Sequence, residues 1–166
     1  MQFNSSFNEV SVPKVCSIPI LPLKSRVPGP CPQTSETDIL DEVFTTFRAN
    51  IFLHNFEIQG DADRLLLYLS IKLQQMIAYM ADQPNRGEAE LNMSMLYKTF
   101  RCPGDRNFEL PGIISLATTA EEKQRFKQVI EQLLTEMVQR ALDKCYNEDG
   151  SKNKWWCHFK NFKFIM

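Results

Sequence analysis

The sequence has 166 residues, of which 43% are hydrophobic, so it is long enough for one domain with a real core and too short for two comfortable ones. Its formal net charge is -1 and its pI is about 6.1, so the chain as a whole offers no electrostatic attraction to nucleic acid or to an anionic membrane. Any basic surface must therefore be local.

Residues 1–33 form a proline-rich arm. Six of the nine prolines occur there, which excludes a helix and favours an extended chain lying on the domain: Pro13, Pro19, Pro22, Pro28, Pro30 and Pro32. Pro19 and Pro22 also have the P-x-x-P spacing of an SH3-domain ligand, with Lys24 and Arg26 downstream. We favour an arm packed on its own domain, so the predicted organisation is an arm at 1–33 and a helical domain at 34–166.

Helical periodicity dominates after the arm. Ser35 and Thr37 are candidate caps for a helix whose apolar residues recur every three or four positions: Ile39, Leu40, Val43, Phe44 and Phe47. A second helix is predicted to begin at residues 60–61, and it carries apolar residues on nearly every face between positions 65 and 80. Because a helix that is apolar all round must be wrapped on most sides, we place it at the centre of a bundle.

A weaker helix is predicted at residues 88–98. Its inward side chains are expected to be Leu91, Met95 and Leu96. Residues 101–118, which contain two Pro-Gly pairs, are predicted to form a loop-rich link to the next helix.

The clearest helix signal begins at the capping box formed by residues 119–122. The helix should reach about Tyr146, and its predicted inward face comprises Phe126, Val129, Ile130, Leu133, Leu134, Met137, Val138, Ala141, Leu142 and Cys145. A polar turn around Gly150 then leads into the C-terminal tail. The predicted fold class is all-α: a single-domain helical bundle with one central helix surrounded by the others, preceded by the extended proline-rich arm.

Cysteine usage and the first residues indicate the cell interior. The cysteines are odd in number, scattered and without a C-x-x-C pair, which fits reduced thiols better than a disulfide framework or a zinc site: Cys16, Cys31, Cys102, Cys145 and Cys157. The opening stretch MQFNSSFNEV lacks the basic and apolar regions of an export signal. The apolar stretch at 65–81 is interrupted by polar residues and is shorter than the roughly 20 apolar residues that a bilayer requires.

Motifs for catalysis are nearly absent. His54 and His158 are far apart in the sequence, and neither lies in a metal-binding motif. Cys157 and His158 are neighbours, but neighbouring side chains point apart on most backbones, so a thiol-protease pair is not expected. The acidic pairs at 61/63 and 121/122 stand at predicted helix starts, where acids suit the helix dipole. We therefore predict a binding protein rather than an enzyme, without cofactor or metal.

Three stretches, in this order, carry a family resemblance: PILPLKSRVPGPCP, TDILDEVFTTFRANIFLHNFEIQGDADRLLLYLSIKL and NKWWCHFKNFKF. They resemble subunit 3, the small helical subunit, of the actin-related protein 2/3 complex. The resemblance is dense over residues 18–80 and 152–164 and thinner between them.

The resemblance implies a helical, non-catalytic subunit of an assembly that binds the side of an actin filament and starts a daughter filament as a branch. The subunit would pack mainly against the actin-related protein 3 subunit. It would bind no ATP, and it would lie in the cytoplasm, in the actin-rich cortex. The alternative outside this family is a free-standing helical adaptor that binds signalling partners through the proline-rich arm or the long amphipathic helix.

The C-terminal tail is the candidate partner-docking site, because it combines lysines and aromatic residues without any acid. The candidate docking residues are Lys154, Trp155, Trp156, Phe159, Lys160, Phe162 and Lys163. One interpretation is docking on an acidic protein surface such as actin or an actin-like subunit. Another is stacking of single-stranded nucleic acid, which the acidic remainder of the chain disfavours. A third is that at least one tryptophan closes the domain core.

Overall fold

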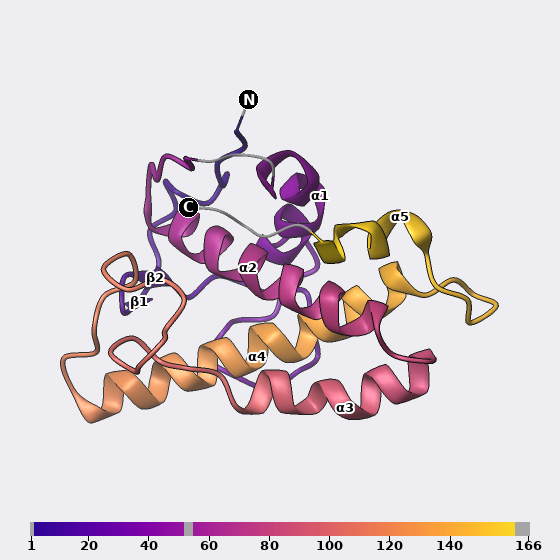
Figure 1. The fold of residues 1–166 in the computed structure, drawn as a ribbon. Helices are drawn as coiled ribbons and strands as arrows, with labels where there is room; N and C mark the ends of the chain where they lie inside the picture. Colours follow the sequence, from indigo (N-terminus) through magenta and orange to yellow (C-terminus); the bar gives the residue numbers. More distant parts are fainter. Residues whose placement is uncertain (1, 52–54, 162–166) are drawn as a thin grey trace.

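The computed structural model describes residues 2–51 and 55–161 and is mostly helical (Figure 1). Its elements, in chain order, are the strands β1 (Lys14–Val15) and β2 (Ile18–Pro19), the helices α1 (Ile39–Ile51), α2 (Asp61–Ala81), α3 (Arg86–Lys98), α4 (Ala120–Cys145) and α5 (Lys154–Cys157), and the 3-10 helix η1 (His158–Asn161). The prediction of an all-α chain is therefore wrong in one respect, because β1 and β2 pair as a small antiparallel sheet. Within the described ranges, no helix combines the length and apolar character that a membrane crossing needs.

A tight turn at Cys16 and Ser17 joins β1 to β2. Both residues have positive φ, 51° and 65°, which is the left-handed pair that a two-residue type I′ hairpin turn requires. Val15 pairs with Ile18 across the turn, and the N–H of Cys16 donates to Oε1 of Glu122 at 3.1 Å. The hairpin is absent from the sequence prediction because Asn and Gly usually occupy such turns, and neither is present here.

Several apolar residues of the proline-rich stretch are buried in the core: Ile18, Ile20, Leu21 and Leu23. Pro19 is itself buried within β2, so the P-x-x-P spacing does not present an accessible ligand. The N–H of Leu23 donates to the C=O of Pro32 at 2.7 Å, and the N–H of Thr34 donates to the C=O of Leu23 at 3.1 Å. These two bonds fold the stretch back on itself before α1 begins.

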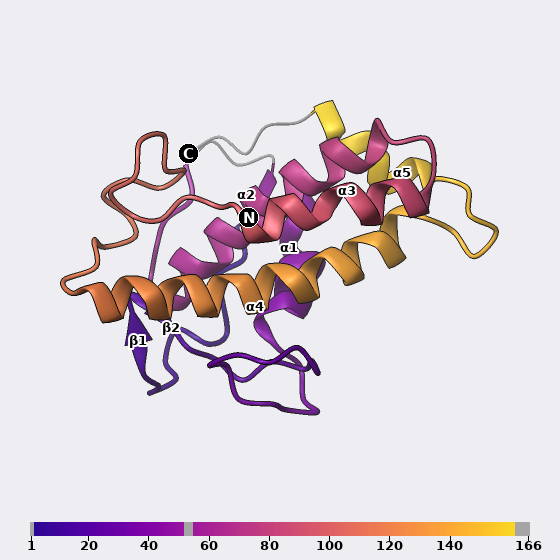
Figure 2. The same cartoon turned by 90° about the horizontal axis from the view of Figure 1, so that it is seen from below.

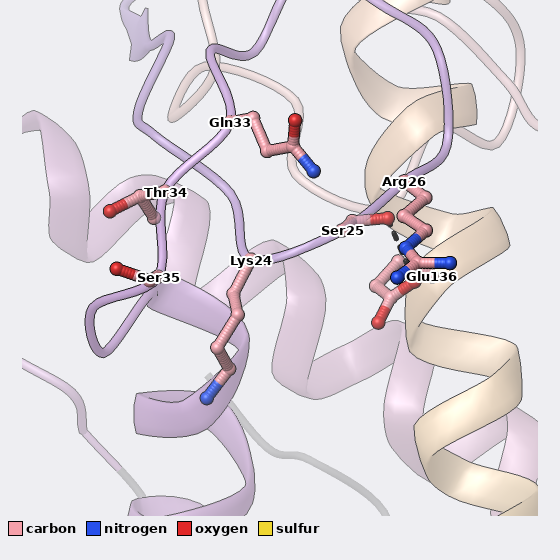
Figure 3. A pocket seen from close by; sticks show the side chains of 7 residues that line it. All are labelled: Lys24, Ser25, Arg26, Gln33, Thr34, Ser35 and Glu136. Atoms are coloured by element: carbon pink, nitrogen blue, oxygen red, sulfur yellow. Dashed lines mark hydrogen bonds between the residues drawn. The ribbon is translucent and has the colours of Figure 1, made fainter.

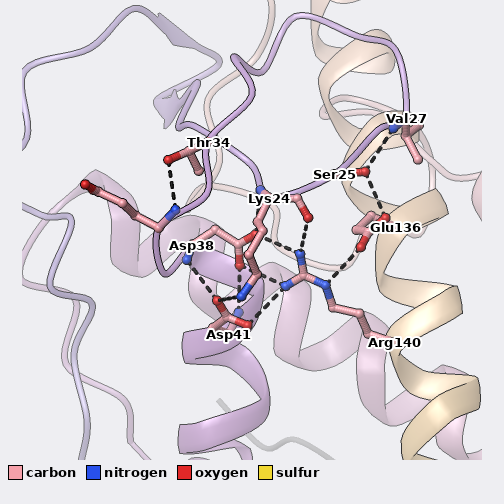
Figure 4. A network of polar contacts seen from close by, with 9 residues as sticks. Lys24, Ser25, Val27, Thr34, Asp38, Asp41, Glu136 and Arg140 are labelled. Atoms are coloured by element: carbon pink, nitrogen blue, oxygen red, sulfur yellow. Dashed lines mark hydrogen bonds and ion pairs between the residues drawn. The ribbon is translucent and has the colours of Figure 1, made fainter.

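An ion-pair network around Arg140 attaches this stretch to α1 and α4 (Figure 4). The guanidinium donates to the Asp38 carboxylate at 2.8 and 2.9 Å, to the C=O of Lys24 at 2.8 Å and to Glu136 at 3.1 Å. Asp38 is fully buried. Burial raises the pKa of Asp38, but hydrogen bonds from Arg140 and from the backbones of Asp41 and Lys24 outweigh it and lower this pKa. The Asp38 carboxylate is therefore ionised in the folded chain, where it pairs with Arg140.

Asp38 also caps α1, in place of the predicted caps Ser35 and Thr37. Its Oδ1 accepts from the N–H of Asp41 at 2.9 Å, while its own N–H donates to Oδ2 of Asp41 at 3.1 Å. This reciprocal pair acts as a capping box and fixes the helix start at Ile39. The predicted apolar face points inward as expected, since its residues are buried or partly buried: Ile39, Leu40, Val43, Phe44 and Phe47.

Helix α2 lies between α1 and α4 (Figure 1) and contacts β2, α1, α3, α4, α5 and η1. It begins at Asp61, as predicted. Buried apolar residues occur on every face: Leu65, Leu66, Leu67, Tyr68, Leu69, Leu73, Met76, Ile77 and Met80. The observed contacts agree with the central position that this pattern predicts.

Helix α4 has the predicted length and the predicted face. Oγ1 of Thr119 accepts from the N–H of Glu122 at 3.0 Å. The Glu122 carboxylate instead accepts from the N–H of Cys16 and from the hydroxyl of Thr118, so only half of the capping box forms. Every residue of the predicted inward face is buried, and the helix ends at Cys145.

Helix α3 runs alongside α4 (Figure 2) but turns a different face inward than predicted. Leu91 and Met95 are 73% and 66% exposed, whereas Ala89 and Met93 are buried. The side chain of Leu96 lies outside what the structure describes. Apolar residues occur around most of this helix, so periodicity could not select a face. Packing against α2 and α4 selects the face that carries the small Ala89 and the adaptable Met93.

Candidate protein-docking site

The chain turns back after α4 and returns to the bundle. Gly150 has a φ of 87°, a conformation that glycine adopts without steric cost. The N–H of Asn147 donates to the C=O of Ser151 at 2.7 Å, and the N–H of Asn153 donates to the C=O of Cys145 at 2.7 Å. These bonds lead the tail back across the end of α4.

Lys152 and Asn153 fix the start of the tail. Nζ of Lys152 donates at 2.8 Å to the C=O of Ala81, the last residue of α2, where a positive charge also suits the helix dipole. Oδ1 of Asn153 accepts from the N–H groups of Trp155 at 3.0 Å and Trp156 at 3.3 Å, and so caps α5. The tail therefore forms a short helical segment, α5 and η1, that packs on α2.

Trp156 and Phe159 face the core. Phe159 is 3% exposed, and its ring meets Phe47 edge-to-face with 5.5 Å between centroids. Trp156 is partly buried, with ring centroids 5.8 Å from Phe44 and 6.3 Å from Phe47. Since Phe44 and Phe47 belong to α1, the tail closes the bundle by packing on α1. Trp156 is thus the tryptophan that serves the core.

Trp155 points to solvent and is 47% exposed. Its ring still meets Trp156 at 4.8 Å and Phe159 at 5.2 Å, both edge-to-face. The guanidinium carbon of Arg48 lies 5.9 Å from the ring centroid, within cation–π range. The ring is therefore held in one orientation while much of it faces solvent. A fixed and exposed aromatic ring is typical of the anchors of protein interfaces.

A hollow of about 400 Å³ lies beside Trp155 and is lined by Arg48, Lys154, His158 and Phe159 as well. The described lining residues are basic or aromatic, and none of them carries a carboxylate. Arg48 is absent from the predicted site, because its proximity to the tail depends on how α1 packs against α5 and η1. In the sequence, only the position of Arg48 next to Phe47 indicates that it could lie near the tail.

The remaining candidate docking residues are Lys154, Lys160, Phe162 and Lys163. Lys154 and Lys160 are exposed, as a docking role requires. Phe162 and Lys163 lie outside the described residues. The structure thus brings Lys154, Trp155 and Phe159 to one hollow.

The Cys157 thiol is not activated as a nucleophile. Burial raises the pKa of the Cys157 thiol, against the lowering influence of Lys152 and Lys160, so the thiol stays protonated at neutral pH. Burial also raises the pKa of Cys145 to about 12. Across residues 2–51 and 55–161, no group of three or more His, Cys, Asp or Glu could hold a metal ion. His54 lies outside these residues.

A second hollow, of about 560 Å³, lies between the proline-rich stretch and α4 (Figure 3). Two of its charged groups, Lys24 and Glu136, are already engaged within the chain. Nζ of Lys24 pairs with Asp41 at 2.9 Å, and the Ser25 hydroxyl donates to Glu136 at 2.8 Å. Glu136 also accepts from Arg140, so it is not available as a general base for Ser25. We assign no site to this hollow.

The model of one protein family, "P21-Arc: ARP2/3 complex ARPC3 (21 kDa) subunit", matches residues 1–166. Curated relatives are similar over nearly the same length. Actin-related protein 2/3 complex subunit 3 of Arabidopsis thaliana is 36% identical over 171 residues, which cover 99% of this chain and 97% of the relative. The protein of the same name from Dictyostelium discoideum is 35% identical, with 99% of this chain and 98% of the relative covered. That from Schizosaccharomyces pombe is 32% identical, with 98% and 96% covered.

These matches confirm the resemblance that the three sequence stretches carry. They extend it through the middle of the chain, where the motifs are thin. The chain belongs to the family of subunit 3 of the actin-related protein 2/3 complex.

Proposed function

We propose that this chain is a non-catalytic structural subunit of the actin-related protein 2/3 complex, which nucleates branched actin filaments from the side of an existing filament. The observation that carries this proposal is the family match over residues 1–166, together with relatives whose names place them in that complex. The partners are the actin-related protein 3 subunit, the other subunits and, through the complex, the actin filament. The chain uses no cofactor, binds no nucleic acid and inserts into no membrane. It acts in the cytoplasm, in the actin-rich cortex.

Within this role, the tail supplies a docking surface for a partner subunit. Trp155 is the aromatic anchor, while Lys154 and Lys160 accelerate encounter with an acidic surface. Trp156 and Phe159 support the surface from behind, since both pack toward α1. The exposure of Trp155 and of both lysines supports this assignment. The proposal also includes Phe162 and Lys163, which follow in the sequence.

The proposed organisation is an arm at residues 1–33 and a helical domain at 34–166. The burial of Ile18 and Leu23 and the bond from Arg140 to Lys24 support an arm that is fastened to the domain. The adaptor alternative has no such support. Pro19 is buried, and the apolar face of α4 is covered by the bundle.

Size-exclusion chromatography of a native extract from the source cells tests the proposal. The chain should elute with the actin-related subunits of a large assembly, and none should elute at the position of the free 19.3 kDa chain. Elution mainly as a free chain would favour the adaptor instead. The same chromatography at high salt is a control. High salt weakens exposed ion pairs but leaves a large apolar interface between subunits intact.

A further inference from the structure

We propose that the hollow between α1 and the tail recognises a carboxylate side chain of a partner protein, with an apolar residue beside that carboxylate lying on Trp155. Arg48 and Lys154 supply the positive charge. This inference rests on the proposed docking role of the tail, and it names the chemistry that the docked partner must present.

The lining of the hollow carries positive charge without a matching acid. Among the described residues that line it, none is Asp or Glu. Within the described parts of the chain, Arg48 and Lys154 take part in no ion pair, whereas seven other lysines and arginines do. Both cations are exposed. A guanidinium and an ammonium group that pair with no acid among the described residues favour a carboxylate from a partner, since charge-assisted hydrogen bonds are the strong ones.

Trp155 adds an apolar wall that is already in place. Its edge-to-face contacts with Trp156 and Phe159 fix the ring before any partner arrives, so little side-chain entropy is lost on binding. Arg48 lies against the same ring. The charge and the flat apolar surface are therefore adjacent, which favours an acidic residue next to an apolar one over an isolated acid.

Single-stranded nucleic acid is the competing class of ligand, because phosphates also seek cations and bases stack on aromatic rings. Stacking of successive bases needs several exposed rings. Trp156 and Phe159 turn toward the core, which leaves Trp155 as the exposed ring among the described tail residues. The net charge of -1 also gives a polyanion no general attraction. The observations therefore favour a protein carboxylate.

The test measures affinity of the full chain for the complex reconstituted without it, at low and high salt. Arg48→Glu should weaken binding at least tenfold at low salt, and the loss should shrink at high salt. Arg48→Lys keeps the charge and should stay within about threefold of the parent. Lys98→Glu, the same charge reversal at the exposed end of α3, is the matched control and should change affinity less than twofold. Arg48→Gln replaces Arg48→Glu if the latter lowers the melting temperature.

Three results would overturn the inference. If Trp155→Ala weakens binding while Arg48→Glu and Lys154→Glu bind like the parent, the tail docks without recognising a carboxylate, and the proposed function stands. If none of these variants changes affinity, the docking role of the tail fails as well. If a labelled oligothymidylate binds the purified chain and Arg48→Glu abolishes that binding, the hollow serves nucleic acid.

Discussion

Phe159 offers a sharp test of whether the tail belongs to the core. Its side chain is 3% exposed and contacts the rings of Phe47, Trp155 and Trp156. Replacing a buried phenylalanine with alanine costs about 3–5 kcal/mol. An independent figure agrees, since removing roughly 150 Å² of apolar surface at ~25 cal/mol per Å² gives about 4 kcal/mol. Trp155→Ala truncates a ring that is 47% exposed, so it should cost only about 1–2 kcal/mol.

Urea unfolding of the purified chain, followed by far-ultraviolet circular dichroism, measures both variants without depending on tryptophan fluorescence. With a slope of ~2 kcal/mol per M, Phe159→Ala should lower the unfolding midpoint by about 2 M and leave the slope unchanged. Trp155→Ala is the matched control from the same tail. If Phe159→Ala unfolds within about 0.5 kcal/mol of the parent, the tail is not part of the core, and the assignment of inward and outward rings is wrong.

Other expected outcomes concern the bundle and its chemistry. Leu66→Ala, at a position 1% exposed in α2, should cost about 2–5 kcal/mol in urea unfolding, and a cost below about 0.5 kcal/mol would mean that α2 is peripheral. The pKa of Asp38 is lowered from 3.8 in the folded chain, so its stabilisation is present above pH 3.8 and is lost as the pH falls further. Asp38→Asn should therefore cost about 3 kcal/mol at pH 7 and flatten the acid-side loss of stability, whereas an unchanged pH profile would contradict the network around Asp38. Cys157→Ala combined with His158→Ala should leave branched nucleation by the reconstituted complex intact in a polymerisation assay, and loss of nucleation with normal assembly would contradict a non-catalytic role.

Sequence signals local to each helix were sufficient to predict the long helices α2 and α4. The start of α4 directly after Thr119 and its buried face follow from a capping residue and a regular apolar spacing, both of which are local to the helix. The central place of α2 follows from apolar residues on all its faces. These features need no knowledge of the neighbouring chain, so they could be predicted.

The remaining features depend on contacts between distant segments. The β1–β2 turn at Cys16 and Ser17 is fastened by Glu122 of α4, and neither the Asn nor the Gly typical of such hairpin turns marks it in the sequence. The face of α3 is chosen by its neighbours. The composition of the tail indicates a docking site, but α1 decides that Trp156 turns inward and Trp155 outward, and α1 also supplies Arg48. The spacing of residues in the sequence does not show which distant segments contact one another.

The most direct test of the central claim is the composition of the assembly that holds this chain. An affinity-tagged chain expressed at its natural level would be purified under native conditions, and the copurifying proteins would be quantified by mass spectrometry. We expect the two actin-related proteins and the other subunits of the complex in amounts equimolar with the chain. Recovery of the chain alone, or with proteins unrelated to that complex, would contradict its assignment as a structural subunit.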